Sequence, residues 1–196
     1  MKILAFTDLH GDKEAVQAIL KKSAEADILI CAGDISDWGE HDKIMLKELE
    51  KAGKPMLLIP GNHEIKEELR ITAEEFEYVI YIHKGSYQLG EYIFFGYGNP
   101  GFSMQEKEFE KVAKQFKKTL KKNDKVVLIT HGPPYGTHLD HLHGRHVGCK
   151  SITDFIKDTK PVLSISGHIH ETFGVKQVFE KTLLVNPGPE GRILKL

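Results

Sequence analysis

The sequence predicts an α/β fold in which a parallel β-sheet is flanked by helices. Short apolar runs alternate with amphipathic stretches from the first residues onward, an order typical of consecutive β-α-β units. Several apolar runs also end in Asp, Asn or His, as expected where strands deliver polar side chains to a ligand site. The 196 residues suffice for one large domain with its own core, so we expect a single domain over residues 1–196.

The first half of the chain supplies three predicted strands with helices between them. The apolar segments "KILAFTD", "DILICAGD" and "PMLLIPGN" read as strands. A helix is predicted near 12–25, where Val16, Ile19 and Leu20 share one face, and another near 41–52. These elements together predict the parallel sheet.

The second half contains further strands and two more predicted helices. Residues 78–98 are rich in β-branched and aromatic residues broken by glycines, which indicates meandering antiparallel strands. Helical spacing of apolar residues predicts a helix within 104–122. The segments "KVVLITH" and "PVLSISGH" read as strands separated by a helix near 150–158, and 172–196 as hairpin strands.

Composition and charge exclude several classes of function. The net charge of −1 and the pI near 6.8 provide no long-range attraction to nucleic acid or to an anionic membrane. No window approaches the ~20 apolar residues of a membrane span, and the N-terminus lacks a hydrophobic signal region. Two cysteines are too few for a disulfide framework. We therefore expect a cytoplasmic protein that does not bind membranes.

Polar side chains follow five of the predicted strands at the point where each strand ends. They are Asp8 and His10, Asp34, Asn62 and His63, His131, and His168 and His170. In open α/β sheets, ligands bind at the carboxyl ends of the strands. Oxygen and imidazole donors without thiolate suit Mn, Fe, Zn or Ni. The sequence therefore predicts a metal cluster at this edge.

The spacing of the donors supports one shared cluster. In "DLH" and "HIH" the donors stand at i and i+2, so an extended backbone would point both to one side. Gly33, Gly61 and Gly167 each precede a donor, where the chain must turn sharply or approach closely. Each donor also has a simpler interpretation as a helix cap, a turn residue or a hydrogen-bonded histidine. One metal cluster explains all of them at once.

These segments resemble those of a known family. The series "D-x-H … GD … GNHE … THGPP … GHIH" is similar to that of the calcineurin-like metallophosphoesterases, and closest to their small cap-less, Icc-related branch. The resemblance runs from Asp8 to His170. It implies a four-layer α/β/β/α sandwich, in which two mixed sheets pack together with helices outside.

The resemblance also implies a ligand set for two divalent ions, among which we favour Mn. The first ion would be held by Asp8, His10, Asp34 and His170. The second would be held by Asp34, Asn62, His131 and His168, with Asp34 bridging. A water activated between the ions would attack the phosphate ester.

The histidine of "GNHE", His63, matches the residue that the family uses at the leaving group. We expect it to act as a general acid and consider Asp8 as its orienting partner. Asp34, as the bridging ligand, is the other predicted catalytic residue, and Asn62 is expected to contact substrate as well as metal.

A histidine-rich loop follows His131. It carries His138, His141, His143 and His146, and its Gly and Pro content predicts irregular structure. We expect the loop to overhang the site, with Arg145 and His146 contacting the substrate phosphate. The alternative is that these side chains are exposed loop residues, and the sequence does not assign their roles.

The predicted function is hydrolysis of small phosphate esters, most of all diesters, with cyclic nucleotides among the candidates that the resemblance offers. A non-catalytic scaffold, like the retromer subunit with this fold, is disfavoured. That subunit lacks the full set of metal-binding histidines, whereas the set is complete in this sequence. A nuclease is disfavoured by the neutral charge and the lack of room for DNA-gripping domains. Phosphomonoesterase activity stays open, and exposed strands within 78–98 allow a homodimer.

Overall fold

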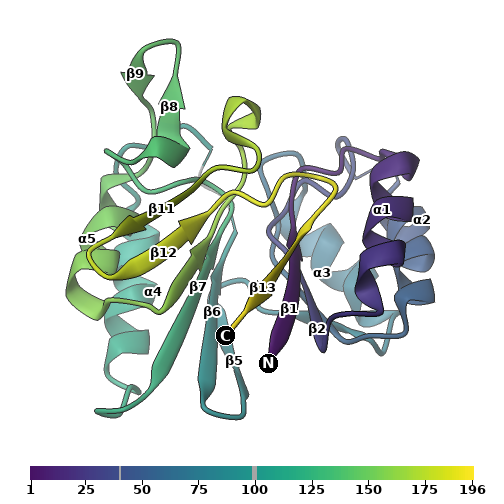
Figure 1. Ribbon diagram of the computed structural model, residues 1–196, viewed down its shortest axis with the longest axis horizontal. Helices are drawn as coiled ribbons and strands as arrows, with labels where there is room; N and C mark the ends of the chain where they lie inside the picture. The colour runs from purple at the N-terminus through teal and green to yellow at the C-terminus, as the bar shows by residue number, and fades with distance from the viewer. Residues whose placement is uncertain (40, 99–100) are drawn as a thin grey trace.

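The computed structural model describes residues 1–39, 41–98 and 101–196. Within them, two β-sheets lie between two layers of helices (Figure 1). Sheet A has the strand order β13-β1-β2-β3-β4. Its strands are β1 (Lys2–Phe6), β2 (Ile28–Cys31), β3 (Met56–Leu58), β4 (Val79–Tyr81) and β13 (Arg192–Lys195). The first four are parallel and β13 runs antiparallel to β1.

Sheet B has the strand order β11-β12-β10-β7-β6-β5. Its strands are β5 (Gly85–Leu89), β6 (Tyr92–Tyr97), β7 (Lys125–Thr130), β10 (Leu163–Ile165), β11 (Lys176–Phe179) and β12 (Thr182–Val185). The central four are parallel, and the two edge strands are antiparallel to their neighbours. Both sheets are therefore mixed.

Helices cover the outer face of each sheet. The helices on sheet A are α1 (Lys13–Ser23), α2 (Asp42–Leu49) and α3 (Lys66–Glu74), and α2 continues into a short 3₁₀ turn. The helices on sheet B are α4 (Lys107–Lys117) and α5 (Lys150–Thr159). The carboxylate of Asp12 caps α1 by accepting hydrogen bonds from the amides of Glu14 and Ala15. None of the described helices is long and apolar enough to cross a membrane.

Three clusters of buried apolar side chains separate the four layers among the described residues. One lies between α1–α3 and sheet A, one between the two sheets, and one between sheet B and α4–α5. Alternate residues of β1 divide between two of them: Leu4 and Phe6 face the helices, while Ile3 and Ala5 face sheet B. Such strands are buried on both faces and read as continuous apolar runs. The predicted four-layer sandwich is confirmed.

The structure corrects two expectations about secondary structure. Residues 78–98 do not form one antiparallel meander, because β4 joins sheet A parallel to β3 and only β5 and β6 pair as a hairpin. The unpredicted helix α3 makes the crossover that a parallel pairing requires. The loop after His131 also has regular structure, since β8 (His141–Leu142) and β9 (Arg145–His146) form a small hairpin.

Candidate metal centre

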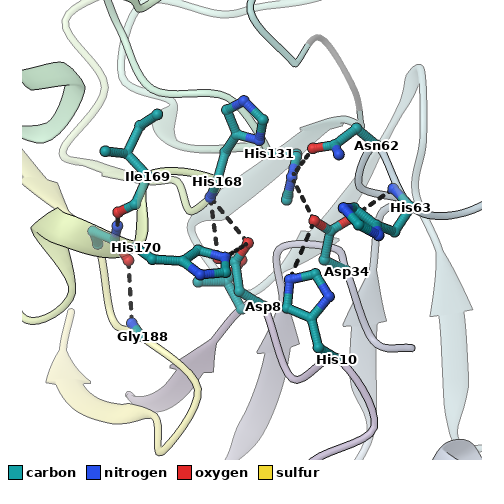
Figure 2. Close-up of polar contacts among 12 residues, drawn as sticks. Asp8, His10, Asp34, Asn62, His63, His131, His168, Ile169, His170 and Gly188 are labelled. Carbon is teal, nitrogen blue, oxygen red and sulfur yellow. Dashed lines mark hydrogen bonds and ion pairs between the residues drawn. The ribbon is translucent and has the colours of Figure 1, made fainter. Parts of the chain in front are cut away.

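The donors predicted from the strand ends lie together where the two sheets meet (Figure 2). Loops after β1, β2 and β3 of sheet A bring Asp8, His10, Asp34, Asn62 and His63. Loops after β7 and β10 of sheet B bring His131, His168 and His170. The carboxyl ends of parallel strands thus converge from both sheets, as expected for a ligand site in α/β folds.

Several donors have a left-handed backbone. The φ angles are 55° for Asp8, 45° for His10, 53° for Asp34 and 69° for His168, a region that side-chain-bearing residues seldom adopt. The expectation that Asp8 and His10 share an extended strand is therefore wrong. β1 ends at Phe6, and the chain then turns across the loop after β2, where the amides of Asp8 and His10 donate to the carbonyls of Gly33 and Asp34 at 3.0 Å. Backbone strain of this kind gathers at functional sites.

Glycines permit the close approach of the donor-bearing loops, as predicted. A Cβ on Gly61 would lie 2.0 Å from Oδ1 of Asp34, and one on Gly167 would lie 2.2 Å from Oδ2 of Asp8. No side chain can be accommodated at such distances without movement of the loops. Gly33 combines a φ of 98° with a Cβ position 2.5 Å from the Gly61 amide, so it needs glycine for two reasons.

Asp34 occupies the middle of the cluster. Its Oδ2 lies 3.2 Å from Nε2 of His131 and 3.7 Å from Nε2 of His10, and its Oδ1 accepts the amide hydrogen of His63 at 2.9 Å. Burial would raise the pKa of this carboxyl, but the hydrogen bond and charge of His131 outweigh burial and lower it to about 2. The carboxylate is therefore held ionised.

His131 is fully buried beside Asp34 and Asn62. Burial opposes its protonation, but the hydrogen bond and charge of Asp34 raise its pKa to about 9. Its Nδ1 lies 2.9 Å from the carbonyl oxygen of Ala32, which requires the proton on Nδ1. Its Nε2 lies 2.9 Å from Oδ1 of Asn62. This orientation points Nε2 into the cluster, where the nitrogen can serve as a ligand when deprotonated.

Asp8 organises the opposite side of the cluster. Both of its carboxylate oxygens accept the amide hydrogen of His168, at 3.1 and 3.0 Å, and its Oδ1 lies 3.6 Å from Nε2 of His170. Burial would raise its pKa, but the interaction with His170 and the charge of His131 hold the pKa below its usual range. The same interaction raises the pKa of His170.

The arrangement of these side chains fits metal ions. Ligand atoms of Asp8, His10 and His170 lie within 4.8 Å of one another, as do those of Asp8, Asp34 and His131. Within the described ranges, the Nε2 atoms of His10 and His168 are buried without a hydrogen-bond partner. A buried nitrogen without a partner is unfavourable unless something binds it, and a divalent cation among carboxylates would do so.

Two acidic residues at the site were not predicted from the sequence. Oδ1 of Asp37 lies 2.7 Å from Nδ1 of His10 and 3.4 Å from Nδ1 of His63. Asp37 is therefore the acidic side chain next to Nδ1 of His63, although that nitrogen makes no hydrogen bond with the described residues. The expected role of Asp8 as the partner of His63 is wrong, because Asp8 contacts His168 and His170. The available signal was the position of Asp37 three residues after Asp34 in "GDISDW".

Glu64 is the second such residue. Its buried carboxylate accepts the amide hydrogens of Ile35 at 2.6 Å, Gly61 at 2.5 Å and Asp34 at 3.0 Å. It thereby joins the loop that carries Asp34 to the loop that carries Asn62. Burial, followed by the charge of Asp34, raises the pKa of Glu64 to about 7. The glutamate is visible in the sequence as the last residue of "GNHE". The neighbouring residues do not indicate which backbone amides it would bind.

The remaining predicted site residues lie outside the cluster. Arg145 and His146 form β9 and are exposed. Nδ1 of His146 lies 2.8 Å from Oδ1 of the buried Asp140, and the Arg145 side chain makes no hydrogen bond or ion pair with any residue that the structure describes. The hairpin projects from the top of the molecule (Figure 1), beside the turn that begins at His170. A contact of Arg145 or His146 with substrate stays a prediction.

The fold and the donor set define an α/β/β/α protein with a candidate metal centre where its two sheets meet. Residues 1–172 match the family model of the calcineurin-like phosphoesterases. The chain therefore belongs to that family, whose members are metal-dependent phosphoesterases with a dimetal centre.

Individual relatives extend over most of the chain. An uncharacterized protein of Methanocaldococcus jannaschii is 29% identical over 200 residues, which are 97% of this chain and 89% of the relative. A protein of Arcobacter nitrofigilis named "Probable glycerophosphodiester phosphodiesterase" is 25% identical over 155 residues, covering 74% of this chain and 56% of its own length. The crystal structure of a Thermus thermophilus protein superimposes with a TM-score of 0.79 at 18% identity, over 95% of this chain and 88% of that one.

Proposed function

We propose that the protein is a dimetal-dependent phosphodiesterase that acts on small substrates. The observation that carries the proposal is the convergence of donors from both sheets on Asp34. Nε2 of His10 and Nε2 of His168 are also buried without a hydrogen-bond partner among the described residues. Buried carboxylates and imidazoles with perturbed pKa values gather at functional sites.

The first ion would be held by Asp8, His10, Asp34 and His170, and the second by Asp34, Asn62, His131 and His168. The position of Asp34 supports a role as the bridging ligand, because its Oδ2 faces both His10 and His131. When bound, two such ions supply Lewis acidity and lower the pKa of a coordinated water. Mn is our favoured metal among the divalent ions that oxygen and imidazole donors suit.

His63 would donate a proton to the departing oxygen. Its Nδ1 lies 3.4 Å from Oδ1 of Asp37, and we assign the proton that would reach a leaving group to Nε2. The short loop that positions His63 is held by the hydrogen bond from its amide to Asp34 and by Glu64. Asn62, next to His63, would contact a phosphoryl oxygen as well as the second ion.

Diesters are favoured over monoesters by two arguments. The relative from Arcobacter nitrofigilis carries the name "Probable glycerophosphodiester phosphodiesterase", which refers to diester cleavage. The cluster is also partly open, since His170 is 53% exposed and His63 29% exposed, which leaves space for a second ester group. Small diesters, including cyclic nucleotides, are therefore the substrates to screen first.

The test uses chelator-stripped protein with bis(p-nitrophenyl) phosphate and with the corresponding monoester. Mn²⁺, Mg²⁺, Ni²⁺ or Zn²⁺ is added back separately, and bound metal is counted by elemental analysis. We expect two ions per chain and diester cleavage well above monoester cleavage. Two bound ions without turnover of either ester would contradict the proposal and direct the search to a protein partner.

A further inference from the structure

Trp38, the only tryptophan of the chain, is exposed beside the candidate leaving-group histidine. The residue is 70% exposed, although tryptophan is usually largely buried. Its ring centroid lies 4.9 Å from that of His63, with 39° between the ring planes. Most of the indole surface therefore stays open to solvent immediately next to the place where a leaving group would depart.

The backbone at Trp38 is unusual as well. Its φ is 55°, in the left-handed region that is costly for a bulky residue. The neighbouring Asp37 contacts His10 and His63, so the turn that carries Trp38 is joined to both histidines. A residue kept exposed in a strained conformation beside the candidate catalytic histidine indicates a function for the ring itself.

A second exposed aromatic ring lies on the sheet B side of the cluster. Phe102, between β6 and α4, is 65% exposed, and its ring centroid lies 4.5 Å from that of His168. A Cβ on the preceding Gly101 would lie within 3.7 Å of both His168 and Asn62. Aromatic surface therefore borders the site on both sides of the line where the sheets meet.

The loop that carries Trp38 also borders a hollow next to the cluster. A cavity of about 470 Å³ is lined by His10, Asp37, His41 and Ile44, among others. Its size is within the range of small-molecule pockets. Two of these lining residues, His10 and Asp37, also contact each other in the cluster, so the hollow adjoins the cluster on this side.

We propose that Trp38 is a stacking platform for a planar aromatic group on the leaving side of the substrate. The proposal rests on the proposed phosphodiesterase function and narrows its substrate class to diesters that carry an aryl group or a nucleobase. A glycerol-type alcohol would leave the indole face uncovered. Ring stacking on an exposed aromatic face suits planar groups of either origin.

Tryptophan fluorescence tests the binding directly, because Trp38 is the only fluorescent indole. Metal-loaded protein is titrated with phenyl phosphate, with adenosine monophosphate and with glycerol phosphate, which carry the same charged group. We expect quenching or a spectral shift with an aromatic ligand and none with glycerol phosphate. A response to phenyl phosphate alone identifies an aryl leaving group, and a response to the nucleotide identifies a nucleoside. Equal responses to all three, or none, overturn the proposal.

Inhibition constants of the same three monoesters provide a second test of stacking on Trp38. With bis(p-nitrophenyl) phosphate as substrate, Trp38→Ala should raise the inhibition constant of the responding aromatic monoester roughly 5- to 100-fold and leave that of glycerol phosphate unchanged. Trp38→Phe should restore most of the difference. Val178→Ala, a change at an equally exposed apolar residue on β11, is the matched control.

The two proposals fail in different ways. Absence of diester turnover with every metal would reject the phosphodiesterase, while the fluorescence titration would still report on stacking. Normal turnover with unchanged inhibition constants in Trp38→Ala would reject the platform and keep the phosphodiesterase.

Discussion

Nε2 of His131 lies 3.2 Å from Oδ2 of Asp34, and this contact joins loops that belong to different sheets. Asp34 follows β2 of sheet A, whereas His131 follows β7 of sheet B. Both residues are almost completely buried. The pair therefore links the two halves of the candidate metal centre, and we expect its protonation to affect both stability and metal uptake.

The stability of the metal-free protein should fall as the pH rises from about 6.5 to 9. The folded-state pKa of His131 is raised from 6.5 to about 9, so the favourable charge on His131 is fully present below 6.5 and is lost as the pH passes 9. Thermal unfolding of chelator-treated protein across this range measures the effect. His131→Gln should flatten the dependence, and an unchanged midpoint in the wild type would contradict the assignment.

Replacing Asp34 with asparagine should remove most of the bound metal. The amide lacks the negative charge that a shared ligand of two cations needs, and its NH₂ group cannot coordinate. We expect fewer than one ion per chain by elemental analysis. Asp158→Asn, which breaks only the exposed ion pair with Lys117, should retain the full wild-type content. Full metal content in Asp34→Asn would exclude the bridging role.

His63→Asn should lower turnover while leaving the metal content intact. General-acid help is typically worth roughly 10²–10⁴-fold, and the loss should be larger for esters with poorly departing alcohols. Rates for a series of diesters with leaving groups of increasing pKa measure this. The same loss for every leaving group would show that His63 positions substrate instead of donating a proton.

Glu64→Gln should destabilise the fold and weaken metal binding together. The carboxylate accepts amide hydrogens from both donor-bearing loops, and the glutamine NH₂ group would leave at least one of these donors without an acceptor. We expect a loss of about 1–3 kcal/mol in the free energy of unfolding, measured by urea denaturation. The exposed Glu25→Gln serves as the control and should change stability little.

Much of the fold could be predicted from local sequence patterns. The elements that were not predicted correctly have identifiable physical causes. α1 was predictable because Asp12 caps it and its apolar residues share one face. α3 was missed because, of its residues, only Leu69 and Ala73 are buried, too few to show a clear period. The direction of β4 depends on pairing with β3, which no local pattern encodes.

The residues of the candidate site divide in the same way: some were recognisable from the neighbouring sequence, and others matter only through contacts with distant loops. Asp8 and His131 were recognisable because each follows an apolar strand. Asp37 and Glu64 lie further along their loops and do not directly follow an apolar strand. Their importance comes from hydrogen bonds and ion pairs with residues of other loops. The extended geometry expected for "DLH" was wrong because the left-handed turn is imposed by the neighbouring Gly33 loop.

The origin of the donors in both sheets has a consequence for biosynthesis. Asp8 leaves the ribosome 160 residues before His168, whose amide hydrogen it accepts, and also before His170. At roughly 5–20 residues per second, Asp8 is synthesised about 8–30 seconds before these histidines. A complete centre would therefore form only after His170 has been synthesised, and fragments that end before it would lack the full ligand set.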